Sequence, residues 1–439
     1  MPAKNVLFIM CDQLRWDYLS CYGHKTLHTP HIDALAGRGV RYDRAYVQSP
    51  VCGASRMSTY TGRYVHAHGA SWNFVPIKAG EMTIGDHLRP LGVRSVLIGK
   101  THMKADAPGM ARLGIDPKSR IGVRIAECGF DPFERDDGIH PYSGHEPNPR
   151  YNDVLREKGL EAENPWEEYA NAGEDEDGDL LSGWFLKNAD RPARVPDPLS
   201  ETPYITGRAM DFIDDALDTD PDQPWVAHVS YIKPHWPYIV PEPYASMFGP
   251  DNVPPANRSD AERENAHPVF AQFMNRRVSR NFSRDDVRAK VIPAYMGLIK
   301  QIDDQMGRLF QHLEDRGIAD QTMIVFTSDH GEMLGEKGFW TKSTMYESAA
   351  CVPLIVAGPG APAGVVRRDP VSLIDIAPTI SAAMGQSCAG FSGRSLLAPP
   401  EPGRSVLSEY HDGGCSVGMT MLRWQAPDGR EIDQLAELI

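Results

Sequence analysis

Short, continuous apolar runs that end in polar residues are the feature that most constrains this chain. The run Asn5–Cys11 ends in Asp12, and the run Thr322–Thr327 leads to Asp329 and His330. Such runs are typical of strands that are buried on both faces of a parallel sheet. Because ligands collect at the carboxyl ends of the strands in open α/β sheets, the residues after each run are well placed for chemistry. The pattern predicts an α/β fold with a site along one edge of its sheet.

The rest of the chain alternates further strands with helices. We expect strands at residues 39–47, 93–98, 225–231 and 351–357, and helices at residues 29–36, 82–91, 204–217, 284–316 and 373–384. Thr29 can cap the first of these helices, and Pro293 predicts a break or kink in the long one. Residues 107–200 are rich in Pro, Gly, Asp and Glu, and they predict an insertion of long loops over one end of the sheet, not a separate domain.

The composition excludes several classes of partner. The 439 residues suffice for a large α/β domain with a smaller one, and their net charge of −14 offers no basic surface to nucleic acid or an anionic membrane. An anionic substrate would therefore need a local positive site. The seven cysteines are scattered without a C-x-x-C spacing, no secretory apolar segment opens the chain, and no apolar run is long enough to span a bilayer. We expect a cytoplasmic protein without a nucleic-acid or membrane partner.

A cysteine and an arginine four residues apart are the most reactive candidates. Cys52 follows a turn at Pro50 and precedes small residues that can open a helix, with Arg56 one helical turn later. The positive end of a helix dipole would lower the pKa of the thiol, and an arginine on the same face could hold an anion beside it. A buried structural cysteine with a surface arginine explains the same pattern, so this motif alone leaves both interpretations open.

The stretch Cys52–Arg56 resembles the type I sulfatase signature C-x-P-S-R of the alkaline phosphatase superfamily, although Ala54 stands where proline is usual. In that family the cysteine is oxidised to formylglycine. The resemblance covers roughly residues 4 to 420. Further segments that are similar to sulfatase elements follow one another along the chain: Thr29–Ala36, Gly99–His102, Lys233–Pro237, Ser328–Glu332 and Asp375–Thr379.

The resemblance implies an alkaline-phosphatase-like fold, in which helices sandwich a mixed, mostly parallel sheet. Residues 1–400 would form the catalytic α/β domain and residues 401–439 a small C-terminal sheet subdomain, with strands at Ser405–Tyr410 and Ser416–Arg423. This subdomain is expected to be abbreviated, because a polar tail follows where relatives continue with more strands. Relatives often self-associate, so a homo-oligomer is a further expectation.

The resemblance also implies a divalent metal ion. Its ligands would be Asp12, Asp329, His330 and the formylglycine made from Cys52, with Gln13 as a further contact. Carboxylate oxygens suit a hard divalent cation. Many sulfatases bind Ca²⁺ with Asp-Asp and Asp-Asn pairs, whereas a nitrogen ligand and one carboxylate fewer lean toward Mn²⁺. Mn²⁺ and Ca²⁺ are therefore both candidates.

The same resemblance assigns roles to the remaining site residues. Arg56 would orient the nucleophile and neutralise charge. Lys100, His235 and Lys342 would surround the anionic oxygens of the substrate and stabilise the charge that develops there. Either His235 or Lys342 would protonate the leaving group, and His102 would be the base that helps to release the product. Lys100 and His102 are two residues apart, so an extended segment would point both to one side.

Three functions remain open from the sequence. The first is a sulfuric ester hydrolase that uses formylglycine at Cys52 and depends on a formylglycine-generating enzyme. The second is a phosphonate or phosphate mono- or diester hydrolase with the same site, because the Asp-Gln and Asp-His pairs resemble the phosphonate monoester hydrolase branch, whereas Lys100 and His102 match sulfatases. The third is a non-hydrolytic protein that binds a metal ion or an anion. Ala54 and the short C-terminus are the sequence features that leave this alternative open. The substrate would be a small-molecule ester, and aryl, choline and carbohydrate sulfates all remain open.

Overall fold

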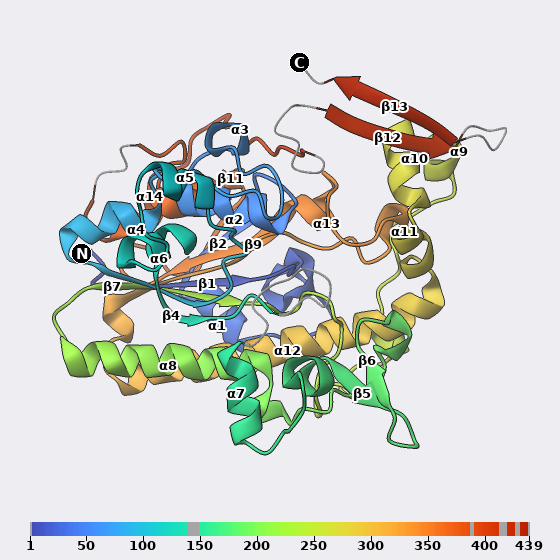
Figure 1. Ribbon diagram of the computed structural model, residues 1–439, viewed down its shortest axis with the longest axis horizontal. Helices are drawn as coiled ribbons and strands as arrows, with labels where there is room; N and C mark the ends of the chain where they lie inside the picture. Colours follow the sequence, from blue (N-terminus) through green and yellow to red (C-terminus); the bar gives the residue numbers. More distant parts are fainter. Residues whose placement is uncertain (1, 139–148, 387–389, 412–418, 426–430, 438–439) are drawn as a thin grey trace.

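Helices cover both faces of one central sheet in the computed structural model (Figure 1). The structure describes residues 2–138, 149–386, 390–411, 419–425 and 431–437. Nine strands of these residues form the sheet in the order β10-β2-β9-β8-β1-β7-β3-β4, with β11 also paired to β2. They are β1 (Asn5–Cys11), β2 (Gly39–Tyr46), β3 (Arg94–Gly99), β4 (Asp131–Arg135), β7 (Trp225–Tyr231), β8 (Thr322–Ser328), β9 (Cys351–Ala357), β10 (Val365–Arg367) and β11 (Val371–Ser372).

Strand β1 lies inside the sheet and contributes to two hydrophobic cores. It pairs in parallel with β7 on one side and with β8 on the other, and β3 and β4 continue in parallel beyond β7. Strand β9 runs antiparallel to both β8 and β2. Successive side chains of a strand point to opposite faces, so Leu7 and Ile9 belong to one core and Phe8 and Met10 to the other. The mixed, mostly parallel sheet predicted from the sequence is confirmed.

Three helices complete the core on each face of the sheet (Figure 1). They are α1 (Pro30–Gly37), α8 (Glu201–Thr219) and α12 (Asp285–Asp315) on one face, and α2 (Cys52–Thr61), α4 (Ile84–Leu88) and α14 (Ile376–Ala383) on the other. The other described α-helices are α3 (Val65–His68), α5 (Ala107–Arg112), α6 (Arg120–Ala126), α7 (Arg150–Glu157), α9 (Ala261–Glu264), α10 (Pro268–Asn275), α11 (Arg277–Phe282) and α13 (Glu347–Ala350). None of the described helices combines the length and the apolar content needed to cross a membrane.

Two regions differ from the sequence predictions. A break or kink was predicted at Pro293, and helix α12 continues through this residue without a break. Packing of the buried face of this helix outweighs the one backbone hydrogen bond that proline removes. Residues 107–200 are more regular than predicted, because β4 adds an edge strand to the central sheet and a hairpin of β5 (Ala172–Glu174) and β6 (Leu180–Ser182) follows it.

The C-terminal region also differs from the prediction. Residues Ser405–Tyr410 form no strand, and the Glu409 N–H donates to the carbonyl of Gln48 at 2.7 Å, close to the end of β2. The second predicted strand, Ser416–Arg423, overlaps β12 (Met419–Gln425), and residues 416–418 lie outside the described residues. Strand β12 pairs antiparallel with β13 (Glu431–Glu437), where a polar tail was predicted. Figure 1 shows this hairpin beside α10, away from the central sheet.

A buried carboxylate joins helix α1 to helix α12. Thr29 was predicted to cap α1, but its side chain makes no capping hydrogen bond. Instead, Asp303 Oδ1 accepts the N–H groups of His31 at 3.0 Å and Ile32 at 2.9 Å. Asp303 is fully buried, and it satisfies two donors that have no partner within the helix at this terminus. The start of α1 is therefore set by a side chain that is remote in sequence.

We predict that Asp303→Ala lowers the free energy of unfolding by about 1–3 kcal/mol, because the N–H groups of His31 and Ile32 lose their acceptor, and the bond of Ile32 is buried. Urea denaturation followed by circular dichroism measures the change. Asp315→Ala, at the exposed end of the same helix, is the control, and it should change the free energy by less than about 0.5 kcal/mol. Equal losses in the two variants would contradict this account of how α1 is held.

Candidate active site

Cys52 is the first residue of helix α2 and is held against the end of strand β8. Asn73 Oδ1 accepts the N–H of Gly53 at 2.8 Å, and the hydroxyl of Ser55 donates to the carbonyl of Asp329 at 2.5 Å. The first turn of the helix is thus tied both to a neighbouring loop and to the residue that follows β8. The thiol group is buried, with Cys52 only 1% exposed.

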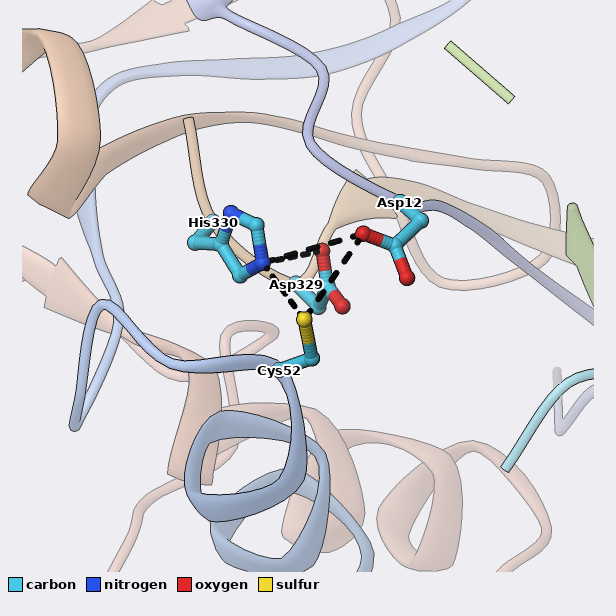
Figure 2. A group of neighbouring side chains, drawn as sticks. All are labelled: Asp12, Cys52, Asp329 and His330. Carbon is cyan, nitrogen blue, oxygen red and sulfur yellow. Dashed lines mark hydrogen bonds and ion pairs between the residues drawn. The ribbon is translucent and has the colours of Figure 1, made fainter. Parts of the chain in front are cut away.

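Four side chains from three parts of the chain converge on one point (Figure 2). Asp12 follows β1, Asp329 and His330 follow β8, and Cys52 opens α2. Their potential ligand atoms all lie within 4.8 Å of one another. His330 Nε2 is 3.1 Å from Cys52 Sγ, and it lies 3.7 Å and 3.6 Å from the Oδ1 atoms of the two aspartates. Two carboxylates, an imidazole and a thiol that face one buried point are a donor set for a divalent cation.

The ring of His330 is fixed in the orientation that a metal ligand needs. Its Nδ1 lies 2.8 Å from the carbonyl oxygen of Gly331, which can only accept, so Nδ1 carries the proton. Nε2 faces the other three side chains, and it offers them a lone pair when the ring is neutral. Metal-binding histidines are commonly held in this way by a hydrogen bond from the other ring nitrogen. The structure thus brings together four of the five residues that were predicted as metal contacts.

Arg56 joins the two carboxylates of the cluster. Its Nε donates to Asp329 Oδ2 at 2.8 Å, and its Nη2 donates to Asp12 Oδ2 at 3.3 Å. Nη1 donates to the carbonyl of Lys100 at 2.9 Å and to Ser230 Oγ at 2.8 Å. The side chain is fully buried and all three nitrogens donate to protein acceptors. The arginine is therefore not free to bind a substrate anion, although its spacing from Cys52 had suggested such a role. Its charge offsets the repulsion between two buried carboxylates.

Two further residues, to which the sequence analysis gave no role, support Arg56. Tyr60, on the next turn of α2, places its hydroxyl 3.5 Å from Arg56 Nη1 and 2.8 Å from His228 Nε2. His228 Nδ1 lies 3.2 Å from the carbonyl oxygen of Phe8, so Nδ1 carries the proton and Nε2 accepts from the tyrosine. The direction of each hydrogen bond is therefore fixed. The spacing of four between Arg56 and Tyr60 was the sequence signal for this contact.

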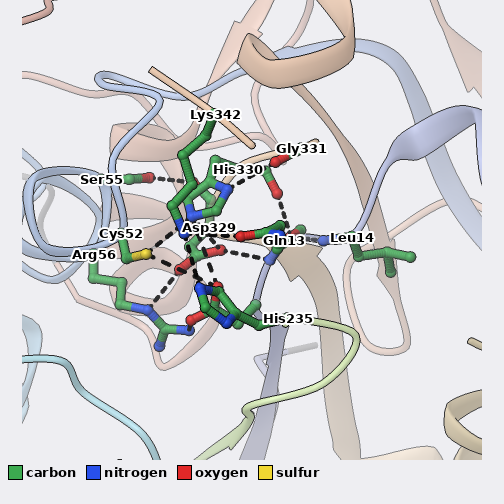
Figure 3. A network of polar contacts seen from close by, with 12 residues as sticks. Gln13, Leu14, Cys52, Ser55, Arg56, His235, Asp329, His330, Gly331 and Lys342 are labelled. Carbon is green, nitrogen blue, oxygen red and sulfur yellow. Dashed lines mark hydrogen bonds and ion pairs between the residues drawn. The ribbon is translucent and has the colours of Figure 1, made fainter. Parts of the chain in front are cut away.

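Two lysines and a histidine border the cluster, and Figure 3 shows Lys342 and His235 among them. Lys100, after β3, places its Nζ 2.7 Å from Asp12 Oδ2. Lys342 Nζ lies 3.0 Å from His235 Nε2. His235 Nδ1 donates to the carbonyl of Trp236 at 2.5 Å, so its Nε2 accepts from the lysine. In a chain with a net charge of −14, these lysines form the local positive site that an anionic substrate would need.

Gln13 and His102 are placed differently from the expectation. Gln13 lies beside the cluster, but protein partners use both ends of its amide: Nε2 donates to Glu332 at 2.6 Å, and Oε1 accepts from Lys342 at 2.8 Å. His102 does not continue an extended segment from Lys100, because its backbone is left-handed (φ 56°). The alternation expected for that pair is therefore wrong. His102 Nε2 is buried and has no hydrogen-bond partner within the described part of the chain.

The surroundings of His235 and His102 keep both imidazole rings neutral, and those of Lys342 keep its ammonium group charged. Burial first, and Lys342 second, hold the pKa of His235 well below its usual value. Burial first, and Lys100 second, do the same to the pKa of His102. Burial opposes the charged form of Lys342, but the cysteine and the two aspartates of the cluster raise its pKa. At neutral pH the two histidines are therefore neutral, and Lys342 keeps its proton.

Comparisons with known proteins identify one family model and several similar proteins. The family model described as Sulfatase matches residues 4–386. The chain is 30% identical over 420 residues to the multifunctional alkaline phosphatase superfamily protein PehA of Trinickia caryophylli, covering 90% of this chain and 77% of that one. It is 26% identical over 441 residues to an arylsulfatase of Clostridium perfringens, covering 94% and 82%. A solved phosphonate monoester hydrolase from Silicibacter pomeroyi matches with a TM-score of 0.78 and 27% identity, over 96% of this chain and 79% of that one.

We predict that Arg56→Met lowers the free energy of unfolding by about 3–5 kcal/mol, because Asp329 loses its buried counter-charge and Asp12 keeps only that of Lys100. Chemical denaturation in the presence of a chelator measures the loss. Arg63→Met is the control, because the ion pair of Arg63 with Glu81 is partly exposed and such pairs contribute about 0–1 kcal/mol. Added Mn²⁺ should restore part of the stability of Arg56→Met alone. A loss no larger than that of the control would contradict the role given to Arg56.

Proposed function

The chain belongs to the sulfatase family, and from this premise we propose that it hydrolyses sulfate monoesters of small molecules. In this proposal a formylglycine-generating enzyme first oxidises Cys52 to formylglycine. The observation that supports it most strongly is the convergence of Cys52 with Asp12, Asp329 and His330 at one buried point. The two lysines that border this point supply the positive charge that a sulfate group needs.

The four converging side chains fit a divalent cation, and we propose that one binds there. Two carboxylates suit a hard ion, and the imidazole of His330 favours Mn²⁺ over Ca²⁺. An oxygen atom of formylglycine would take the place of Cys52 Sγ. When bound, the ion would lower the pKa of that hydroxyl and so provide a nucleophile near neutral pH.

Formylglycine supplies chemistry that a thiol lacks. The hydrated aldehyde has two hydroxyl groups: one attacks the sulfur of the ester, and the other, on losing its proton, restores the aldehyde as sulfate leaves. A cysteine thiolate has no second group of this kind. The proposed cycle therefore requires the modification of Cys52.

The hydrogen bonds support separate roles for the basic groups. Lys342 is the proposed acid, because His235 donates its ring proton to Trp236 and accepts from the lysine. His102 is the proposed base that helps to release sulfate, because its buried Nε2 is unpaired among the described residues and its ring is neutral. Lys100 would stabilise the charge on the sulfate oxygens.

A phosphonate monoester hydrolase is the second candidate. The TM-score of 0.78 to a solved enzyme of that name favours it, as do the Asp-Gln and Asp-His pairs after β1 and β8. Lys100 and His102 favour sulfate, because the phosphonate branch tends to have uncharged hydroxyl residues at these positions. A sulfate monoester and a phosphonate monoester both carry one negative charge on a tetrahedral centre, so one site could take either.

We predict a changed mass for the tryptic peptide Ala45–Arg56 of protein that is produced together with a formylglycine-generating enzyme. The peptide should lack one sulfur and two hydrogens and carry one additional oxygen, because the thiol of Cys52 becomes an aldehyde. Mass spectrometry measures this. Protein produced without that enzyme is the control and should keep the thiol. An intact thiol in both preparations would remove the proposed nucleophile.

We predict that the modified protein prefers 4-nitrophenyl sulfate to 4-nitrophenyl phenylphosphonate by at least about tenfold in kcat/KM. The two esters release the same alcohol, so the ratio reports the choice between sulfur and phosphorus. Cys52→Ala should lower kcat for sulfate at least about a thousandfold, because it removes the nucleophile, whereas Cys21→Ala should not. A clear preference for the phosphonate would establish the second candidate in place of the first.

A further inference from the structure

Phe74 is an exposed phenylalanine whose backbone conformation is unfavourable. It stays 42% exposed, although its side chain is large and apolar. Its φ of 64° lies in the left-handed region, where a bulky residue is an outlier. A ring that remains this exposed gains only part of the free energy that burial gives a phenylalanine. Packing of the fold is therefore a weak reason for this residue at this position.

The turn that carries Phe74 favours glycine. Residues 72–75 form a four-residue turn, in which the N–H of Val75 donates to the carbonyl of Trp72 at 3.3 Å. Of the two central residues, only Phe74 has a positive φ. This is the pattern of a type II turn, whose third residue is usually glycine because glycine has no Cβ to clash. The phenylalanine therefore strains its own backbone, and residues strained in this way are concentrated at functional sites.

The turn lies against the residue that follows Cys52. Asn73 Oδ1 accepts the N–H of Gly53 at 2.8 Å. A Cβ atom at position 53 would lie 3.1 Å from the Cα of Asn73, so glycine permits this close approach. Phe74 is the next residue along the chain, and consecutive Cα atoms are about 3.8 Å apart. The turn thus holds Phe74 beside the first turn of α2, where the nucleophile is proposed to form.

The ring of Phe74 packs against the proposed base. Its centroid lies 5.4 Å from that of the His102 ring, and the two planes are inclined at 38°. His102 has a left-handed backbone as well. Asp137 Oδ1 holds this backbone by accepting the N–H groups of Thr101 at 2.9 Å and His102 at 3.1 Å. Two residues with unfavourable backbones are therefore held with their rings in contact at the candidate site.

A phenyl ring selects among the esters that the site could take. It offers a flat apolar face and no hydrogen-bonding group. Aromatic rings pack on such a face with centroids about 4.5–7 Å apart. The two lysines that border the site disfavour a cationic alcohol such as choline, because like charges repel. The hydroxyl groups of a sugar need hydrogen-bond partners, which the phenyl ring lacks. Among aryl, choline and carbohydrate sulfates, the aryl sulfates fit Phe74 best.

We propose that Phe74 is a specificity-determining residue that binds the aromatic ring of the alcohol, so that the substrates are aryl esters. The proposal rests on the proposed function, because that function places the acid group of the ester at Cys52 and gives His102 a role beside it. Phe74 takes no part in making or breaking bonds. It contacts the ring of the ester in the ground state and in the transition state alike, so it acts on substrate binding.

Phe74→Gly tests the proposal, because it removes the ring and also the backbone strain. Relief of the strain opposes the loss of contacts and the greater freedom of glycine in the unfolded chain. The Tm should therefore stay within about 2 °C of the wild-type value. Retained stability would show that an altered affinity does not come from a damaged fold.

Phenylmethanesulfonate is the binding probe, because it resembles phenyl sulfate but its carbon–sulfur bond is not an ester bond. The protein is produced with a formylglycine-generating enzyme, loaded with Mn²⁺ and titrated in a calorimeter. The probe should bind to Phe74→Gly about tenfold more weakly than to the wild type. The Kd of inorganic sulfate, which has no ring, should change by less than about twofold.

Leu91→Ala is the matched control, because Leu91 is also 42% exposed and lies at the opposite end of β3 from Lys100. This variant should bind the probe within about twofold of the wild type. Phe74→Tyr keeps the ring and should bind the probe within about threefold. Should Phe74→Gly fail to fold, Phe74→Asn replaces it, because asparagine tolerates a left-handed backbone, and the same results are expected of it.

Three results of the titrations would overturn the proposal. They are unchanged binding of the probe by Phe74→Gly, equal weakening for the probe and for sulfate, and a failure of the wild type to bind the probe. The first would show that the ring makes no contact with the ligand, and the second would show that the variant has altered the acid-binding part of the site instead.

Turnover gives a second readout. For 4-nitrophenyl sulfate, the KM of Phe74→Gly should rise about tenfold while kcat changes by less than about threefold, because an interaction made equally in both states affects binding alone. A loss in kcat with an unchanged KM would overturn the proposal. If the wild-type protein hydrolysed no ester at all, the proposed function would be refuted, and the binding of phenylmethanesulfonate would still decide the role of Phe74.

Discussion

The attraction between one buried arginine and two buried carboxylates is the interaction on which the rest of the site depends. Asp12 and Asp329 lie side by side because β1 and β8 pair in parallel. Without a counter-charge they would repel each other in a medium that screens poorly. Arg56 supplies that charge from α2. The same contact therefore holds α2, which begins at Cys52, against the ends of β1 and β8, which present the carboxylates. The packing of the fold and the geometry of the site depend on the same interaction.

The parts of the structure that follow from local rules could be predicted from the sequence. Strands β1, β7 and β9 coincide with the apolar runs, because a strand buried on both faces is rich in apolar side chains. The same runs placed Asp12 and Asp329 at the carboxyl ends of their strands. The remaining candidates, such as Lys100 and Lys342, came from the resemblance to sulfatases, since no rule of spacing predicts which loops meet.

The parts that could not be predicted depend on contacts between distant residues. The spacing of Arg56 from Cys52 suggested an anion site, yet its partners Asp12 and Asp329 lie 44 and 273 residues away. Residues 405–410 have the composition of a strand, but no neighbouring strand pairs with them. Glu332 ends the segment Ser328–Glu332, and no rule of spacing predicts that Gln13, 319 residues away, donates to it.

The distances along the chain within the site also set an order of events during synthesis. The hydroxyl of Ser55 bonds the carbonyl of Asp329 across 274 residues. At about 5–20 residues per second, roughly 15–55 s separate the emergence of these two segments from the ribosome. During that interval β8 and the residues after it, which meet the start of α2 in the finished fold, do not yet exist, and in that fold Cys52 is 1% exposed. If Cys52 is modified as proposed, the thiol would be accessible to an enzyme during a period that is set by translation and that slower elongation lengthens.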